Sequence, residues 1–292
     1  MKTNNKKSLM DYVIIIFFSV LVLLTLYPFY NVLIISLSNT VSTATYTPYI
    51  LPYTIDFTGY STILNDEKFI NALKISIFVT IVGTSINMFL SVTGSYVLSK
   101  KDLIGRKFML SLILFTMLFN GGLIPTYLNI KNLGLIDSVW SMILPTALNT
   151  YYLIIMKNYF IGLPESLIEA AKLDGASEWV ILRKIILPIS KPFMATFVLF
   201  YSVERWNEWY NALLYISQST LVPLQIYLRE ILISLNTQLT AQAQQMIGTT
   251  QMVSSTSVQM AAIIVTALPI ICIYPLLQRH FVSGVMVGGL KE

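Results

Sequence analysis

The chain has 292 residues, of which 55% are hydrophobic and only 11% are charged, whereas roughly a quarter of the residues of an average soluble domain are charged. This composition excludes an ordinary soluble protein. It indicates an all-α protein that crosses the membrane several times, because a helix satisfies its own backbone hydrogen bonds in lipid. The net charge of +5 at pH 7 does not indicate nucleic-acid binding, since no basic stripe remains once membrane topology is taken into account.

Six apolar stretches are long enough to cross the hydrocarbon layer, which takes about 18 to 20 residues. They cover residues 12–36, 70–98, 107–130, 138–160, 192–215 and 258–280. The first stretch comes after several lysines, as the apolar part of a signal peptide does. However, its apolar run is too long for a signal peptide and no small-residue cleavage site follows, so we expect this stretch to be retained as a membrane span. We therefore expect a single transmembrane domain over residues 1–292, with its core spans in residues 70–215.

The basic residues indicate which side of the membrane each loop faces. Fourteen fall on one side of the six-span arrangement, namely Lys2, Lys6, Lys7, Lys100, Lys101, Arg106, Lys107, Lys157, Lys172, Arg183, Lys184, Lys191, Arg279 and Lys291. Three fall in loops on the other side, namely Lys68, Lys131 and Arg229. By the positive-inside rule, the first side is the cytoplasm. Both termini, the loop 161–192 and the tail 281–292 are then cytoplasmic, and residues 216–257 form an extracytoplasmic loop.

The third and fourth stretches carry polar residues that a lipid-facing helix does not need. In the third, Asn120-Gly121-Gly122 precedes Pro125, and such a run breaks a helix. A broken backbone at membrane depth is tolerated where it is buried or lines a cavity, so Asn120 is a candidate for a substrate pathway, with a plain kink as the alternative. In the fourth, we expect the polar face that carries Tyr151 to look inward.

The loop 161–192 is both charged and periodic, and we expect a helix, a tight turn and a second helix. Pro164 suits the first helical position, and Glu165 favours the positive start of a helix. Asp174-Gly175 indicates the end of that helix because glycine tolerates the left-handed conformation, and Ser177 can cap the second helix.

The first helix of this loop is expected to be amphipathic. Its apolar face is predicted to contain Leu163, Leu167, Ala170 and Ala171. Its polar face is predicted to contain Glu165, Glu169 and Lys172. A helix of this kind requires a partner surface.

The fifth stretch carries ionisable residues at membrane depth, where charges are costly and are functional candidates by default. At about 100° per residue, one arc of its helix contains Tyr201, Glu204, Glu208, Asn211 and Tyr215. This arc could line a hydrophilic passage in which carboxylates accept hydrogen bonds from a hydroxyl-rich solute. Alternatively, Arg205 and Glu208 could form an ion pair beside an interfacial aromatic belt. The candidates for the substrate pathway are therefore Asn120, Tyr151, Tyr201, Glu204, Trp206, Asn207, Glu208, Trp209 and Asn211.

No residues form a recognisable catalytic or metal-binding constellation. The sequence lacks a G-x-x-x-x-G-K-[ST] phosphate loop, an H-E-x-x-H motif and a paired cysteine motif. Cys272 is its only cysteine and His280 its only histidine, so neither offers a ligand cluster. We therefore expect a chain that is not an enzyme, that holds no metal or cofactor and that depends on another component for its chemistry.

The loop 161–192 contains Glu169-Ala170-Ala171, then Asp174-Gly175-Ala176, then Leu187-Pro188 and Pro192. This pattern resembles the EAA loop of the membrane subunits of binding-protein-dependent ABC importers, and we call residues 161–192 the EAA loop. The resemblance extends over nearly the whole chain to the sugar-uptake branch, including the maltose-importer type and its relatives for complex oligosaccharides. The break at Asn120-Gly121-Gly122 and Trp206-Asn207 also resemble that branch.

The resemblance implies a six-span, type I permease in a prokaryotic plasma membrane. It also implies a second homologous permease subunit, an extracytoplasmic sugar-binding protein and two cytoplasmic ATPase subunits that hold ATP and magnesium. In this family the EAA loop forms a coupling helix that contacts the ATPase. The corresponding residues here are Glu169, Ala170, Ala171, Asp174 and Gly175, and the family's tail contact would involve Gly284, Gly288 and Gly289.

Two other functions remain open from the residues alone. A secondary carrier driven by an ion gradient could use Glu204 or Glu208 as its titrating group. A scaffold that recruits a soluble ATPase without carrying a solute is the other possibility. Both would have to account for the complete EAA pattern.

Overall fold

The computed structural model describes residues 9–38, 55–233 and 256–272. Within these ranges the regular structure is helical, apart from one isolated bridge between Ser38 and Ile55. The chain divides into two compact units, residues 1–66 with 228–268 and residues 67–227 with 269–292. Some predicted features lie outside the described residues, namely His280, Gly284, Gly288 and Gly289.

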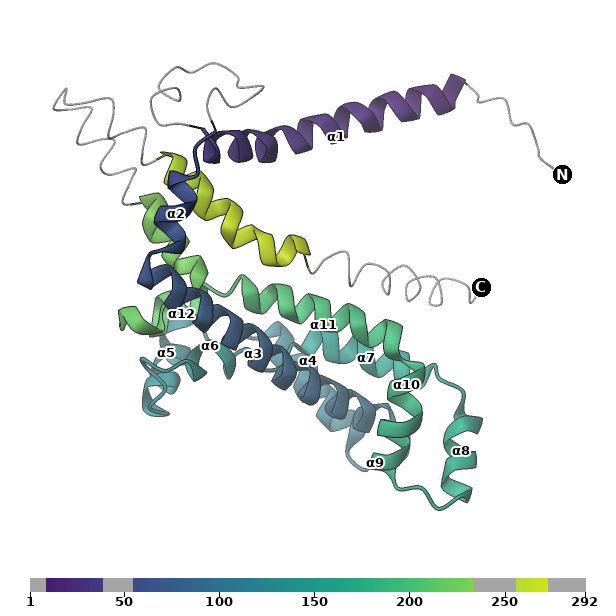
Figure 1. The fold of residues 1–292 in the computed structure, drawn as a ribbon. Helices are drawn as coiled ribbons and strands as arrows, with labels where there is room; N and C mark the ends of the chain where they lie inside the picture. Colours follow the sequence, from purple (N-terminus) through teal and green to yellow (C-terminus); the bar gives the residue numbers. More distant parts are fainter. Residues whose placement is uncertain (1–8, 39–54, 234–255, 273–292) are drawn as a thin grey trace. The chain divides into compact units, whose positions relative to one another are not determined.

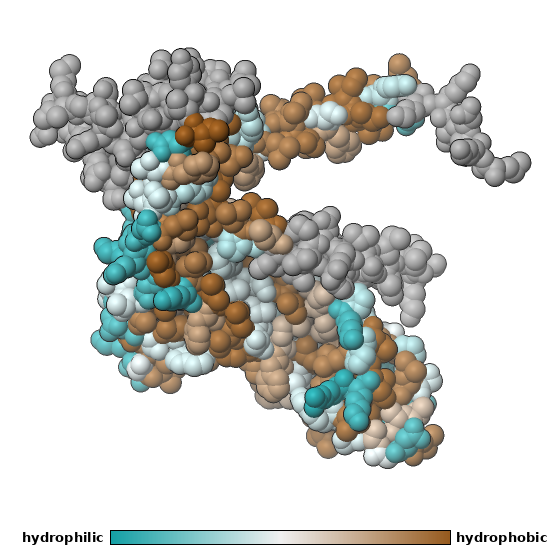
Figure 2. All heavy atoms as spheres, viewed as in Figure 1, coloured by the Kyte–Doolittle hydropathy of each residue, from teal (hydrophilic) through white to brown (hydrophobic). Residues whose placement is uncertain are grey.

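The first unit contains α1 (Leu9–Ser36), α2 (Thr58–Leu64) and most of the helix Thr256–Cys272. The apolar side chains of α1 are exposed over residues 9–30 (Figure 2), as expected for a helix that contacts lipid. At the end of α1, the Ser36 hydroxyl lies 2.7 Å from the Tyr60 hydroxyl of α2. Because α1 has 28 residues of high mean hydropathy, it agrees with the first predicted span.

The second unit is built around α3 (Glu67–Ser99), which packs against both α7 (Thr150–Ile161) and α11 (Lys191–Trp206) (Figure 1). With 33 residues, α3 agrees with the second predicted span. Small or polar residues on its buried side allow its neighbours to approach closely. One of them, Ser91, lies 2.7 Å from the hydroxyl of the fully buried Tyr201.

Three of the predicted spans are interrupted in the second unit. The third is divided into α4 (Arg106–Leu118) and α5 (Leu123–Asn132), which meet at 114°, so the break predicted at Asn120-Gly121-Gly122 is confirmed. The fourth is divided into α6 (Trp140–Ile143) and α7, with residues 144–149 between them not helical. The fifth is interrupted at residues 207–209, between α11 and α12 (Tyr210–Tyr215). The predictions of one continuous helix over residues 138–160 and of one over residues 192–215 were therefore wrong.

The EAA loop contains α8 (Glu165–Leu173), α9 (Glu178–Ile181), the π-helix η2 (Leu182–Ile186) and α10 (Leu187–Ile189). The helical run 178–189 meets the run 191–215 at 88°. Beyond α12 lie η3 (Ser219–Leu221) and a helix over residues 224–233. Among the described residues, α1 and α3 are each long and apolar enough to cross a membrane alone, and each bent pair could do so as one span.

In the part of the second unit that the structure describes, two clusters of buried apolar residues join its helices. The larger one joins α3, α7 and α11 to the EAA loop through Ala171, Ile181, Leu182 and Ile186. The smaller one includes Val79 of α3, Met142 and Ile143 of α6 and Ala212 of α12. The EAA loop is therefore packed onto the helical bundle over both of its helical parts.

Candidate functional site

The first helix of the EAA loop has the boundaries that its sequence predicts. Pro164 precedes the first helical residue, Glu165, so it lies one position before the place we expected. At the other end Gly175 has a φ of +76°, the left-handed conformation expected there. The amides of Gly175 and Ala176 bond to the carbonyls of Lys172 and Ala171 at 3.0 Å each, which is a Schellman motif that closes α8.

The apolar face predicted for α8 is only partly packed on the bundle. Leu163, Ile168 and Ala171 pack against the larger apolar cluster. Leu167 and Ala170, which were predicted on the same face as Ala171, are exposed instead. Each of them precedes a packed residue by one position and so points about 100° away from it on the helix. The predicted apolar face is therefore divided, with one arc packed on the bundle and the neighbouring arc left exposed for a partner surface.

The outer side of α8 is consequently an exposed apolar edge with charged neighbours. Leu173 is 89% exposed and Leu167 is 43% exposed. Ala170, Glu169 and Asp174 are exposed as well. A short helix with one side packed on its own bundle and the other bare is suited to contact a partner protein.

Glu178 of α9 ties the EAA loop to the end of α3. Its carboxylate accepts a hydrogen bond from the Tyr96 hydroxyl at 2.6 Å and forms ion pairs with Lys100 at 2.9 Å and Lys172 at 3.0 Å. The Lys100 ammonium also lies 4.4 Å from the centre of the Tyr96 ring, within the range of a cation–π interaction. One carboxylate thus connects α3, α8 and α9, and we call Glu178, Tyr96, Lys100 and Lys172 the Glu178 brace.

The surroundings of Glu178 strongly favour the ionised form of its carboxyl group. Burial raises the pKa of its carboxyl, but the hydrogen bonds from Tyr96, Lys100 and Lys172 outweigh burial and lower that pKa to about 2. Nearby, the hydrogen bond from Lys101 lowers the pKa of Glu165. Both carboxylates are therefore ionised at neutral pH, as their roles as acceptors require.

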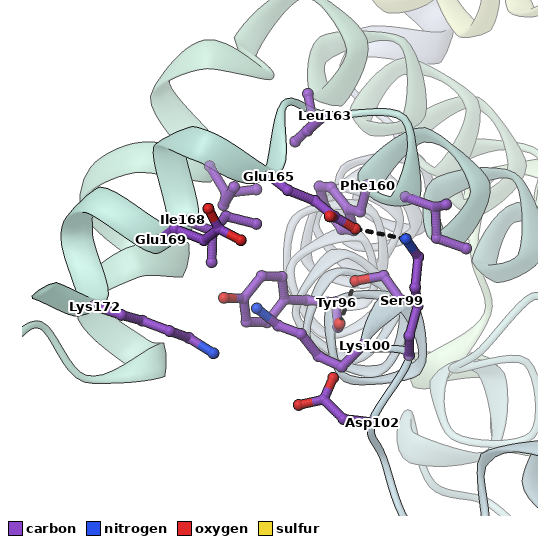
Figure 3. A pocket seen from close by; sticks show the side chains of 13 residues that line it. Tyr96, Ser99, Lys100, Asp102, Phe160, Leu163, Glu165, Ile168, Glu169 and Lys172 are labelled. Atoms are coloured by element: carbon purple, nitrogen blue, oxygen red, sulfur yellow. Dashed lines mark hydrogen bonds and ion pairs between the residues drawn. The ribbon is translucent and has the colours of Figure 1, made fainter.

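A recess of about 230 Å³ lies between α8 and the end of α3. Figure 3 shows Glu169 and Lys172 of α8 facing Tyr96 and Lys100 across it. Its other charged residues include Lys101 and Glu165, which form an ion pair at 2.6 Å. Because each lysine that lines the recess is already paired with a carboxylate, we interpret the recess as the seam between two packed elements rather than as a ligand site.

The polar arc predicted for the fifth stretch is only partly on one face. Tyr201 is fully buried, whereas Glu204 is exposed and accepts a hydrogen bond from the Tyr152 hydroxyl at 2.7 Å. Tyr152 packs edge-on against Tyr201, with ring centres 5.0 Å apart, and the neighbouring Tyr151 is exposed. Glu204 and Tyr151 are therefore accessible polar groups of this region.

The predicted ion pair between Arg205 and Glu208 is not formed. Arg205 is buried and donates to Asn87, to Thr146 and to the carbonyls of α6. Glu208 instead accepts hydrogen bonds from the amide of Asn211 at 2.9 Å and from its side chain at 3.0 Å. The pair was inferred from a spacing that holds within one helix, but the helix ends at Trp206.

The remaining candidates of the fifth stretch are dispersed around this helix end. Trp206 is buried, Trp209 is 47% exposed and Asn207 is exposed, with its side-chain oxygen 3.3 Å from the Gln225 amide. Asn211 is buried at 8% exposure. The structure thus brings Glu208 and Asn211 together, whereas Glu204 is bonded to Tyr152.

Two of the helix breaks in the second unit, together with α12, line one pocket of about 470 Å³. Its lining comes from the first break (Asn120, Gly121, Gly122), from the second (Pro145, Thr146) and from α12 (Tyr210, Asn211, Tyr215), among others. Two of the predicted candidates, Asn120 and Asn211, line it. Pro145 and Thr146 were missed, although Pro145 is the one signal of a break that the sequence offers there.

Comparison with known proteins places these features in context. The family described as "binding-protein-dependent transport system inner membrane component" matches residues 7–287. The chain is 39% identical over 286 residues to the polygalacturonan/rhamnogalacturonan transport system permease protein YtcP of Bacillus subtilis (strain 168), covering 98% of this chain and 99% of that protein.

Two solved structures are similar as well. One is a bacterial ABC transporter involved in the import of the acidic polysaccharide alginate, with 33% identity, a TM-score of 0.84 and coverage of 95% of this chain and 100% of that one. The other is a bacterial alginate ABC transporter in complex with an alginate pentasaccharide-bound periplasmic protein, with 15% identity, a TM-score of 0.50 and coverage of 76% and 81%. None of these similarities favours an ion-driven carrier.

Proposed function

Since this chain belongs to the family of inner membrane components of binding-protein-dependent transport systems, it is a permease subunit and not an enzyme, and we propose that its solute is an oligosaccharide. The relatives named for polygalacturonan or rhamnogalacturonan and for alginate support this choice of substrate class. Both relatives are matched over more than nine-tenths of this chain. In the proposed transporter, this permease forms one half of a pathway that a second, homologous subunit completes.

The bare outer edge of α8 is the observation that carries the coupling part of the proposal. Its inner side is packed on the bundle, and Leu167, Ala170 and Leu173 remain exposed. We assign this edge to a cleft of a cytoplasmic ATPase, with Glu169 and Asp174 as polar contacts. ATP and magnesium belong to the ATPase subunits, since this chain carries no phosphate loop.

The remaining assigned residues of the EAA loop have supporting roles. Ala171 anchors α8 on the bundle, and Gly175 permits the turn that closes the helix. A rigid helix of this kind converts closure of the ATPase dimer into tilting of the membrane helices. The substrate shifts the equilibrium between the states of the transporter because it makes different contacts in each state. Contacts of Gly284, Gly288 and Gly289 with the ATPase remain part of the proposal, as does the six-span, cytoplasmic-termini topology.

The substrate pathway is assigned to the accessible polar groups. Glu204 and Tyr151 offer a carboxylate and an aromatic ring on one surface, and Asn120 and Asn211 line the pocket at the helix breaks. Hydroxyl-rich solutes are recognised by such hydrogen-bonding groups together with aromatic faces. Tyr201 and Trp206 are buried and would hold this surface in place, with Asn207, Glu208 and Trp209 at its edge.

The substrate proposal is tested with the complete transporter in proteoliposomes, loaded with ATP and supplied with its extracytoplasmic binding protein. Uptake of labelled oligogalacturonate, alginate oligosaccharide or arabino-oligosaccharide is measured. We expect ATP-dependent uptake of at least one of them and none with ATP omitted. Uptake that is driven by a pH gradient without ATP, or ATP-dependent uptake of a non-sugar solute alone, would overturn the proposal.

The coupling proposal is tested by placing a charge on the bare edge of α8. Leu173→Asp should leave the permease stable, because the side chain is 89% exposed, while lowering ATPase co-purification at least about tenfold, as loss of a buried contact in an interface does. Ile104→Asp is the matched control, since Ile104 is 94% exposed but lies outside the EAA loop. Equal co-purification of the two variants with the ATPase would contradict the assignment of α8.

A further inference from the structure

Arg205 is a buried cation that is fully engaged as a hydrogen-bond donor. It is 4% exposed, and it makes five hydrogen bonds with four residues. Its acceptors are Asn87 Oδ1 at 2.9 Å, Met142 O at 2.7 Å, Ile143 O at 3.1 Å, Thr146 Oγ1 at 2.8 Å and Thr146 O at 2.7 Å. Since a guanidinium has five N–H groups in a fixed plane, no donor remains for a substrate.

These acceptors belong to the second helix break. Met142 and Ile143 are the last residues of α6 before the non-helical segment 144–149, and their carbonyls are groups that the end of a helix leaves without partners. Asn87 reinforces the same place, since its amide donates to Thr146 O at 2.9 Å and to Ala147 O at 3.0 Å. Arg205 and Asn87 together replace the backbone bonds that the break removes.

The path of the Arg205 side chain depends on a glycine in α3. A Cβ atom on Gly83 would lie 2.8 Å from Cδ and 2.9 Å from Nε of Arg205, which is too close for any real contact. Gly83 therefore provides the space through which the guanidinium reaches the break. We call Arg205, Asn87 and Gly83 together the Arg205 clamp.

The Arg205 clamp connects the two regions that the proposed function requires. Arg205 lies at the end of α11, whose other end follows directly from the EAA loop. The segment that it holds contributes Pro145 and Thr146 to the wall of the pocket at the helix breaks. We propose that Arg205 is a positioning residue for transport, which makes the segment 144–149 move with α11 when the EAA loop moves.

This proposal rests on the proposed function as an ATP-driven permease. It assigns Arg205 a role distinct from substrate contact and from pairing with a carboxylate. A lysine would retain the positive charge but could not supply the fixed fork of five donors. The geometry of the fork, and not the charge, is therefore what the proposal requires.

The first test uses variants of the reconstituted transporter. Arg205→Met retains the length of the stem, Arg205→Lys retains the charge, and Gly83→Ala obstructs the path of the side chain. Each should lower the maximal rate of transport at least about tenfold, since each removes several hydrogen bonds to a charged group. The concentration of loaded binding protein that gives half of the maximal rate should not change.

The matched control for Gly83→Ala is Gly94→Ala. Gly94 lies in the same helix, but a Cβ there meets only the flexible end of Leu153, 3.2 Å away, so transport should remain within about twofold of the parent. The double variant Gly83→Ala with Arg205→Met should be no slower than Arg205→Met alone, because both changes act on one group of contacts.

The second test follows the segment itself. In a Cys272→Ser background, Leu148→Cys places a reporter thiol on the segment 144–149, where Leu148 is 40% exposed. Its rate of reaction with a thiol reagent should differ between the resting and vanadate-trapped transporter, and Arg205→Met should abolish that difference. A purely structural role for Arg205 would lower the yield of the complex while leaving the difference intact.

The outcomes separate the two levels of the proposal. If the parent transporter takes up no oligosaccharide with ATP, the proposed function fails. If the parent transports and Arg205→Lys or Gly83→Ala matches it, or if the Leu148→Cys difference persists in Arg205→Met, the clamp proposal fails and the proposed function stands.

Discussion

Gly175 shows how one backbone angle determines the shape of the EAA loop. Its φ of +76° closes α8, and a Cβ at this position would meet no atom within 4 Å, so any cost of substitution comes from the backbone and not from crowding. An alanine there costs about 1 to 2 kcal/mol of left-handed strain. We predict that Gly175→Ala lowers the rate of ATP hydrolysis that the binding protein stimulates. The decrease should be about 5- to 30-fold, the factor that corresponds to a free-energy cost of this size.

The control for this prediction is Gly162→Ala. Gly162 ends α7 with an ordinary φ of −78°, and a Cβ there would lie 3.4 Å from the nearest atom, the carbonyl of Tyr159. Gly175→Asn should lie between the two, because asparagine tolerates the left-handed region better than alanine. If Gly162→Ala were as harmful as Gly175→Ala, the conformation of Gly175 would not be the cause.

The Glu178 brace predicts a specific pH dependence. The pKa of Glu178 is about 2 in the folded protein, below its ordinary value of 4.5, so its contribution to stability is complete above pH 4.5 and is lost as the pH falls toward 2. The side chain is half exposed, which limits this contribution to about 0.5 to 1 kcal/mol. Glu178→Gln should therefore lower the thermal midpoint of the permease equally at pH 5 and pH 7.

The difference in thermal midpoint between the parent and Glu178→Gln should then shrink below pH 4. The measurement is thermal unfolding of both proteins in detergent across this pH range. A difference that grows on acidification would contradict the sign of the argument. Lys101 and Glu165 offer a comparison, because their ion pair is exposed and Glu165→Gln should change the midpoint very little.

At the scale of elements, the end of α11 separates two carboxylates that look equivalent in the sequence. Glu208 accepts two hydrogen bonds from Asn211 at the start of α12, and their loss costs about 1 to 3 kcal/mol. Glu204 is exposed, and its single hydrogen bond in the described structure comes from Tyr152.

We therefore predict opposite phenotypes for the two positions. Glu208→Ala should lower the thermal midpoint of the permease with a smaller effect on transport per assembled complex. Glu204→Gln should leave the midpoint unchanged, because glutamine still accepts a hydrogen bond from Tyr152, while lowering oligosaccharide uptake severalfold. Stability and uptake measured on the same preparations decide this, and an unstable Glu204→Gln with normal specific uptake would contradict it.

The helix breaks show what the sequence can and cannot predict. The break at Asn120-Gly121-Gly122 is encoded locally, because two glycines remove the side chains that restrict the backbone. The break at residues 144–149 is not, since Pro145 alone allows either a kink or an interruption. It is maintained by Asn87 and Arg205, which are far from it in the chain, and such partners cannot be inferred from spacing.

The same limit applies to the faces of α8. The start and the end of this helix follow from Pro164 and Gly175, which act on their own backbone. Its orientation depends on Ile168 and Ala171 meeting a core that α3, α7 and α11 supply. Local signals therefore predict where elements begin and end, whereas the packed face and the partners of Arg205 require the assembled bundle.

At the scale of the whole molecule, the unequal distribution of basic residues predicts the orientation of the chain. Lys100, Lys101 and Arg106 flank the turn between α3 and α4, whereas Lys131 stands alone at the end of α5. Ile104 is 94% exposed in the first of these regions and Leu133 is 62% exposed beside the second. By the positive-inside rule, we expect Ile104 to face the cytoplasm and Leu133 to face the exterior.

Single-cysteine variants measure this orientation directly. In the Cys272→Ser background, Leu133→Cys should react with a membrane-impermeant thiol reagent in intact cells, whereas Ile104→Cys should react only in inside-out vesicles. The inverse pattern would place the EAA loop outside the cell, where no ATP is available, and would contradict both the topology and the coupling role of α8. Because α4 lies between the two positions and is bent by 114° against α5, reaction of both thiols from one side would show that this bent pair does not cross the membrane.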